Sequence, residues 1–77
     1  MKSRPVSAVT LARIAADLRR YGITHTVVAA EATKTSPRGH VSRSMIVHTL
    51  AARTKSANVL ATARRLIAVA RARVRAA

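Results

Sequence analysis

One face of a helix predicted near residues 42–52 combines side chains that donate hydrogen bonds with one exposed valine. The residues of this face are Ser42, Arg43, Ser44, Val47 and His48. The apolar Ile46 and Leu50 fall on the opposite face, which is therefore expected to be buried. A guanidinium group donates two parallel hydrogen bonds to guanine O6 and N7, and an apolar side chain can contact the thymine methyl group. We therefore expect this face to contact base edges, with Arg43 as the main base contact, Val47 on thymine and His48 on a base or a phosphate.

Other residues are suited to phosphate groups. They are Thr24, His25, Lys34, Arg38, Arg53, Lys55 and Ser56, the last through the free backbone N–H groups at the start of a helix. Contacts of this kind position a protein on a nucleic acid without selecting its sequence. The sequence thus offers two kinds of nucleic-acid contact.

The overall charge agrees with a polyanionic partner. The 77 residues include 15 Lys and Arg but only two acids, Asp17 and Glu31, which gives a net charge of +13. We expect the two acids to form surface ion pairs, Asp17 with Arg13 or Arg20 and Glu31 with Lys34, and not a catalytic pair.

Enzymatic and metal-dependent functions find little support in the sequence. A single domain of this length excludes most enzymes, and no phosphate-binding glycine loop or nucleophile elbow occurs. His25, His40 and His48 are spaced too irregularly for zinc, and the chain has no cysteine. We expect no cofactor, no metal and no small-molecule substrate.

The predicted core is thin. The hydrophobic fraction is 49%, but nearly half of those residues are alanine, and Tyr21 is the single aromatic residue. We therefore expect oligomerisation or binding to add stability. No apolar run has the length of a transmembrane helix, and no secretory signal is evident, so a cytoplasmic, nucleoid-associated protein without a membrane partner is expected.

Capping signals divide the chain into four predicted helices. Residues 1–6 form a basic arm, and residues 7–77 form one all-α domain. The predicted N-caps are Ser7, Thr24, Ser42 and Ser56, and Gly22 is expected to follow the end of the first helix. Ile23 and Val28 have the spacing of a hydrophobic staple, in which the residue before the N-cap packs on the fourth helical residue. Val41 and Ile46 repeat that spacing. The stretch from Thr33 to His40 is predicted as the only real loop.

The last predicted helix is the longest and carries five arginines. They are Arg64, Arg65, Arg71, Arg73 and Arg75. Its apolar stripe is longer than a small monomer can cover, so its later part is a candidate dimer seam, with simple core or a frayed end as the alternatives. The candidate seam consists of Leu66, Val69, Ala70 and Val74.

Three stretches resemble the DNA-binding domains of the lambda-repressor and Cro type. Residues 22–29, GITHTVVA, are similar to the start of the second helix in that helix-turn-helix family, and residues 41–50 to its recognition helix. Residues 53–56 resemble the basic loop before the fourth helix. The resemblance covers roughly residues 9–70, and the length is similar to that of small phage regulators of the Ner and Cro kind. It implies a small bundle of four or five helices with a helix-turn-helix.

The chain departs from that family between the second and third helices. The family's turn has three or four residues, whereas this chain carries an insertion at Thr33 to His40. Either the second helix continues through about Lys34, or the loop bulges outward and adds Lys34 and Arg38 to the DNA-facing surface.

These patterns predict a sequence-specific double-stranded DNA-binding protein. We expect a transcriptional regulator, in particular a repressor of phage, prophage or plasmid type, that acts as a homodimer on an inverted repeat. The alternative is a sequence-indifferent nucleoid, architectural or RNA-binding protein driven by charge alone. Two further hypotheses are a cationic helix at residues 59–75 that lies on a membrane surface, and an antitoxin or partner-binding helix-turn-helix protein.

Overall fold

The computed structural model of the protein describes residues 7–37 and 39–76, and in these ranges it contains four helices and no strand. The helices are α1 (Ala8–Arg20), α2 (His25–Thr35), α3 (Arg43–Leu50) and α4 (Ala57–Ala76). The predicted all-α fold class is therefore confirmed. None of the described helices combines the length and apolarity that crossing a bilayer requires. The basic arm at residues 1–6 and Arg38 lie outside the described residues.

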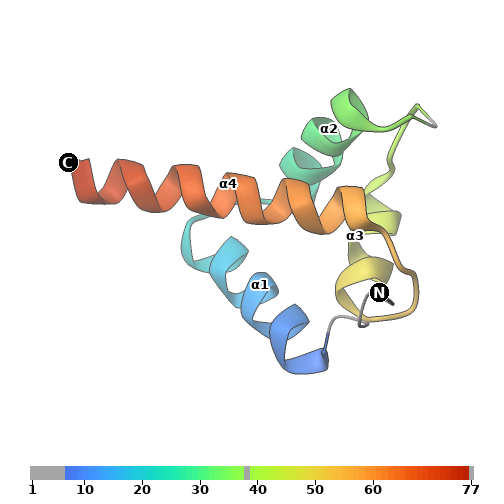
Figure 1. Cartoon of the computed structure of the whole chain (residues 1–77), viewed down its shortest axis with the longest axis horizontal. Helices are drawn as coiled ribbons and strands as arrows, with labels where there is room; N and C mark the ends of the chain where they lie inside the picture. The colour runs from blue at the N-terminus through green and yellow to red at the C-terminus, as the bar shows by residue number, and fades with distance from the viewer. Residues whose placement is uncertain (1–6, 38, 77) are drawn as a thin grey trace, which may run out of the picture.

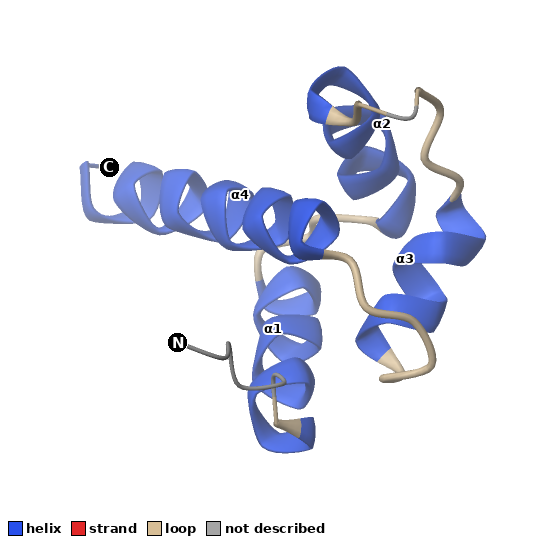
Figure 2. Ribbon diagram, turned by 45° about the vertical axis from the view of Figure 1, so that its right-hand side comes forward, coloured by secondary structure: helices blue, strands red, loops and turns tan. Residues whose placement is uncertain are grey.

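The long helix α4 organises the other three. It packs against α1, α2 and α3, and α3 also contacts both α1 and α2. Figure 1 shows α4 crossing the molecule, with its C-terminal end projecting past the other helices. In Figure 2, α3 lies at the edge of the molecule near the start of α4, opposite that projecting end.

Hydroxyl side chains start all four helices, as predicted. The backbone N–H groups of Thr10, Val27, Met45 and Val59 donate to the hydroxyl oxygens of Ser7, Thr24, Ser42 and Ser56, over 3.2–3.3 Å. Each bond satisfies one N–H group that a helix start leaves without a partner inside the helix. The short helices therefore begin at positions that the sequence fixes locally.

Two helices end in the same backbone motif with different residues. After α1, the N–H groups of Gly22 and Ile23 donate to the carbonyl oxygens of Arg19 and Leu18, and Gly22 has φ +68°. This is a Schellman motif, in which the left-handed residue is usually glycine.

The end of α3 repeats the motif without a glycine. The N–H groups of Ala52 and Arg53 donate to Thr49 and His48 carbonyl oxygens, over 3.1 and 2.9 Å, and Ala52 has φ +62°. Because its Cβ crowds the backbone in the left-handed region, Ala52 holds a strained conformation.

The core contains few large side chains. The largest fully buried side chains are Leu18, Val28, Ile46, Thr49 and Val59. Val28 and Ile46 come from the two predicted staples, and Val41 is buried with them while Ile23 is half-buried against the same cluster. Both staple patterns thus place their residues in one core. Tyr21 is also half-buried against it.

Two sequence predictions about local structure are wrong. The loop does not begin at Thr33, because α2 continues through Thr35 and the connection to α3 occupies residues 36–42. This favours the alternative in which the second helix is longer. Asp17 pairs with neither Arg13 nor Arg20, since its carboxylate lies 3.8 Å from Arg71 of α4. That partner is distant in sequence and close only because α1 packs on α4. The predicted pair of Glu31 with Lys34 is confirmed, at 3.0 Å.

The two Schellman ends form a matched pair for a stability test. We expect Gly22→Ala to lower the free energy of unfolding by about 1 kcal/mol, because a Cβ there meets no atom and only the backbone conformation is penalised. Ala52→Gly removes the same penalty and should raise the free energy of unfolding by up to about 1 kcal/mol. Urea unfolding of both variants measures the two effects. A destabilised Ala52→Gly variant would contradict the strain assigned to Ala52.

Candidate nucleic-acid interface

The outer face of α3 carries the residues that the sequence assigned to base contacts. Ser42, Arg43, Ser44, Val47 and His48 are all exposed, and Val47 retains 44% of its accessible surface. The opposite face holds Ile46, which is fully buried, and Leu50, which is half-buried. In the described part of the chain, the side chains of Arg43 and His48 have no hydrogen-bond or ion-pair partner. Their donors are therefore available to a ligand.

The hydroxyl of Thr33 positions the start of α3. It donates to the carbonyl oxygen of Ala29 over 2.8 Å and accepts the backbone N–H of Val41 over 2.9 Å. Val41 directly precedes the N-cap Ser42, so this contact ties the connection to the side of α2. This role of Thr33 was not predicted, because the residue was expected in a loop.

The end of α2 is also held by a residue from far along the chain. The Asn58 amide donates to the Ala32 carbonyl oxygen over 2.9 Å, and its own oxygen lies 2.7 Å from the Thr35 hydroxyl. Asn58 belongs to the first turn of α4, so the end of one helix and the start of another are coupled. No local pattern indicates this contact, because the partners are more than 20 positions apart.

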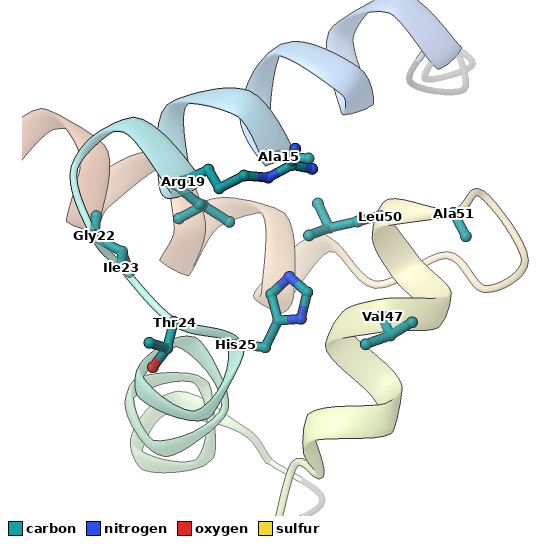
Figure 3. A pocket seen from close by; sticks show the side chains of 10 residues that line it. Ala15, Arg19, Gly22, Ile23, Thr24, His25, Val47, Leu50 and Ala51 are labelled. Carbon is teal, nitrogen blue, oxygen red and sulfur yellow. The ribbon is translucent and has the colours of Figure 1, made fainter.

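A groove lies beside the outer face of α3. It has a volume of about 520 Å³ and is formed by the end of α1, the start of α2 and the second half of α3. Figure 3 shows the imidazole of His25 between α2 and α3, with Val47 on α3 across from it. Arg19 reaches over the groove from α1. The groove has an apolar base, with Leu18, Ile23 and Leu50 among its lining residues.

We call the outer face of α3 together with the rim of this groove the α3 surface. Its exposed members are Arg19, Thr24, Ser42, Arg43, Ser44, Val47 and His48, and the half-buried His25 belongs to it as well. Sequence reasoning did not identify Arg19 as part of this surface. Its position three residues before Gly22 was the available signal, because that spacing puts it in the last turn of α1, close to the start of α2.

Both acidic residues of the chain face α4, away from the α3 surface. The Glu31 carboxylate binds Lys34 over 3.0 Å and Arg65 over 3.3 Å. Asp17 lies against Arg71, whose pKa is raised by a hydrogen bond to Tyr21 and by the nearby Asp17 charge. Because the chain has only two acids, the α3 surface contains cations and no anion.

The predicted phosphate contacts are distributed over several elements. Thr24 and His25 line the groove, and the exposed Arg53 and Lys55 follow α3 directly in the chain. Ser56 is half-buried at the start of α4. Lys34 lies apart from this group, because Glu31 holds its ammonium on the side of α2 that faces Arg65.

No protein-family model, curated protein or solved structure matches this chain. The class of protein defined by the fold is therefore a small all-α domain of four helices, within residues 7–37 and 39–76. The resemblance to lambda-repressor and Cro-type domains stays a prediction. Among the described residues no group of three potential metal ligands occurs. The functional proposal rests on the residues of the α3 surface.

Replacing Thr33 tests whether its hydroxyl positions α3. Thr33→Val keeps the size and shape of the side chain but leaves the Val41 N–H without its acceptor, so we expect a loss of about 1–3 kcal/mol in the free energy of unfolding. Thr26→Val is the control, because Thr26 is exposed on the same helix. Equal effects of the two substitutions would show that helix propensity, and not the contact with Val41, causes the loss.

Proposed function

We propose that the protein binds double-stranded DNA sequence-specifically, with the outer face of α3 in the major groove. The observation that carries this proposal is the cationic, acid-free α3 surface, on which Arg43 has no partner among the described residues. A positive surface attracts the phosphate backbone, while an unpaired guanidinium can bind a guanine edge.

The position of α3 supports this proposal. The helix lies at the edge of the molecule, and the major groove is about 12 Å wide, which admits one helix. Recognition helices contact base edges mainly through their N-terminal residues. Arg43 is the first residue of α3, and Ser42 and Ser44 flank it. Val47 follows one turn later on the same exposed face.

Cations near α3 are placed to contact the flanking phosphates. Arg53 and Lys55 are exposed in the connection that follows α3, and His25 lies across the groove at the start of α2. Such contacts fix the position of the protein on the duplex but carry no sequence information. Arg19 joins this set as a phosphate contact that the structure adds.

Together with the resemblance to lambda-repressor and Cro-type domains, this supports a transcriptional regulator of phage, prophage or plasmid type. A repressor of this kind acts as a homodimer on an inverted repeat, with half-sites about one helical turn apart. The proposed dimer seam uses Leu66, Val69, Ala70 and Val74 of α4. Val69 and Val74 retain 44% and 63% of their accessible surface, which leaves apolar area for a partner to cover. Leu66 and Ala70 are half-buried.

The alternative function is binding to DNA or RNA without sequence preference. It is favoured by exposed arginines on α4, far from α3, that serve no base contact. Selection from a pool of random duplexes separates the two functions. A shared palindromic motif among the selected duplexes supports the regulator, whereas the absence of any motif supports sequence-indifferent binding.

Arg43 and Lys55 should have different effects on DNA binding. We expect Arg43→Ala to relax discrimination at one base pair by about 1–3 kcal/mol, since a bidentate contact to guanine is lost. Lys55→Ala should weaken binding to all duplexes equally and reduce the slope of log K against log[salt] by about 0.9, because one phosphate contact is lost. Fluorescence anisotropy with matched and mismatched duplexes measures both. Unchanged discrimination in Arg43→Ala would contradict the assignment of α3 as the recognition helix.

The dimer seam can be tested by introducing charge at one of two similarly exposed valines. Val74→Lys should shift sedimentation from dimer to monomer and weaken binding to a palindrome, because a cation then lies in an apolar seam. Val9→Lys is the control, since Val9 on α1 is 66% exposed and outside the seam. A dimer that persists in Val74→Lys excludes this seam.

A further inference from the structure

The exposed arginines of α4 divide into two groups by their partners. Glu31 binds Arg65, while Asp17 and Tyr21 hold Arg71. Arg64, Arg73 and Arg75 are exposed and have no partner among the described residues. The two acids of the chain thus neutralise part of α4 and leave three cations unpaired. These three have no role in the proposed contact between α3 and DNA.

None of the three unpaired arginines lines the groove beside α3. In Figure 3, the faint ribbon of α4 passes behind α1. The last buried residue of α4 is Ile67, and its C-terminal end projects beyond the bundle in Figure 1. With a rise of 1.5 Å per residue, Arg75 lies about 27 Å along the helix axis from Ala57, the end near α3.

An ion pair links the projecting part of α4 to α1. Arg71 lies 3.8 Å from Asp17 and also contacts Tyr21, both near the end of α1. The guanidinium of Arg20 lies over the Tyr21 ring, 5.7 Å from its centre. Arg73 lies about two and a half turns from Arg64 and therefore falls on the opposite side of α4. Arg64 and Arg75 are three turns apart and fall on one side of α4, with a separation of about 16 Å.

We propose that Arg64 and Arg75 form a second DNA-binding surface, so that the protein bridges two duplex segments. Their partner is a second duplex, because unpaired guanidinium groups on one side of a helix match the dense, regular charge of a phosphate backbone. A membrane fits less well, since interfacial helices bury a wide apolar face with large side chains. The exposed large apolar residues of α4 are Val69 and Val74 alone, within the described part of the chain. This inference rests on the proposed function for the first duplex.

A capture assay tests the bridge directly. One duplex is attached to beads, the protein is added, and the capture of a second, fluorescent duplex is measured. Binding to a single short duplex is measured in parallel by anisotropy. We expect Arg64→Gln/Arg75→Gln to reduce capture about tenfold, because two phosphate contacts are lost, while binding to the short duplex through α3 changes less than about threefold.

Two control variants separate this surface from net charge and from dimerisation. Arg13→Gln/Lys34→Gln removes the same charge from exposed positions of α1 and α2 and should leave capture unchanged. Val74→Lys should still capture, since each chain carries both surfaces. Equal loss of capture in both double variants overturns the proposal, because net charge then explains bridging. Loss of capture in Val74→Lys alone also overturns the proposal, because bridging then depends on the dimer.

The remaining outcomes distinguish this inference from the proposed function. Full capture by Arg64→Gln/Arg75→Gln overturns the second surface but leaves α3 as the DNA contact. The second surface is also overturned if the protein binds acidic lipid vesicles through the α4 arginines more tightly than it binds duplex. If Arg43→Ala binds all duplexes as the unchanged protein does, and the α4 variant loses short-duplex binding, both proposals fail and α4 becomes the single site.

Discussion

The burial of Ile46 determines how α3 presents its outer face. The helix has eight residues, which is too short to be stable alone, since isolated helices below about 12–15 residues are marginal in water. Ile46 is fully buried in one cluster with Val28 of α2 and Val59 of α4. Burying a side chain of this size contributes about 1.5–3 kcal/mol. With Ile46 buried, Val47 lies about 100° around the helix and is exposed, and Arg43 is exposed at the first position of α3. The same contact therefore stabilises α3 and leaves its candidate DNA contacts accessible.

Hydrogen bonds between distant residues convert this packing into a defined orientation. Thr33 binds the backbone before α3, and Asn58 joins the end of α2 to the start of α4. In a core without phenylalanine or tryptophan, such bonds supply direction that apolar contacts alone do not, since hydrophobic burial is non-directional. The strained Ala52 then turns the chain so that Arg53 and Lys55 follow α3 closely.

The distribution of charge depends on where two carboxylates lie. A net charge of +13 is compatible with any polyanion. With Glu31 and Asp17 both paired to arginines of α4, the α3 surface keeps its cations unpaired. The same pairing divides α4 into neutralised and free arginines. The charge pattern is therefore a consequence of helix packing, because residues distant in sequence neutralise one another only where helices meet.

The sequence by itself determined the local features of the fold. Caps such as Ser42 and the glycine after α1 depend on neighbouring residues, and the inward face of α3 follows from the spacing of Ile46 and Leu50. Those signals act over a few positions, so sequence reasoning located the helices and the exposed face of α3. Tertiary structure alone decided the partner of Asp17, the contact of Thr33 with Val41 and the place of Arg19 beside the groove. Each of these depends on how helices pack, which the spacing of residues along one chain does not encode.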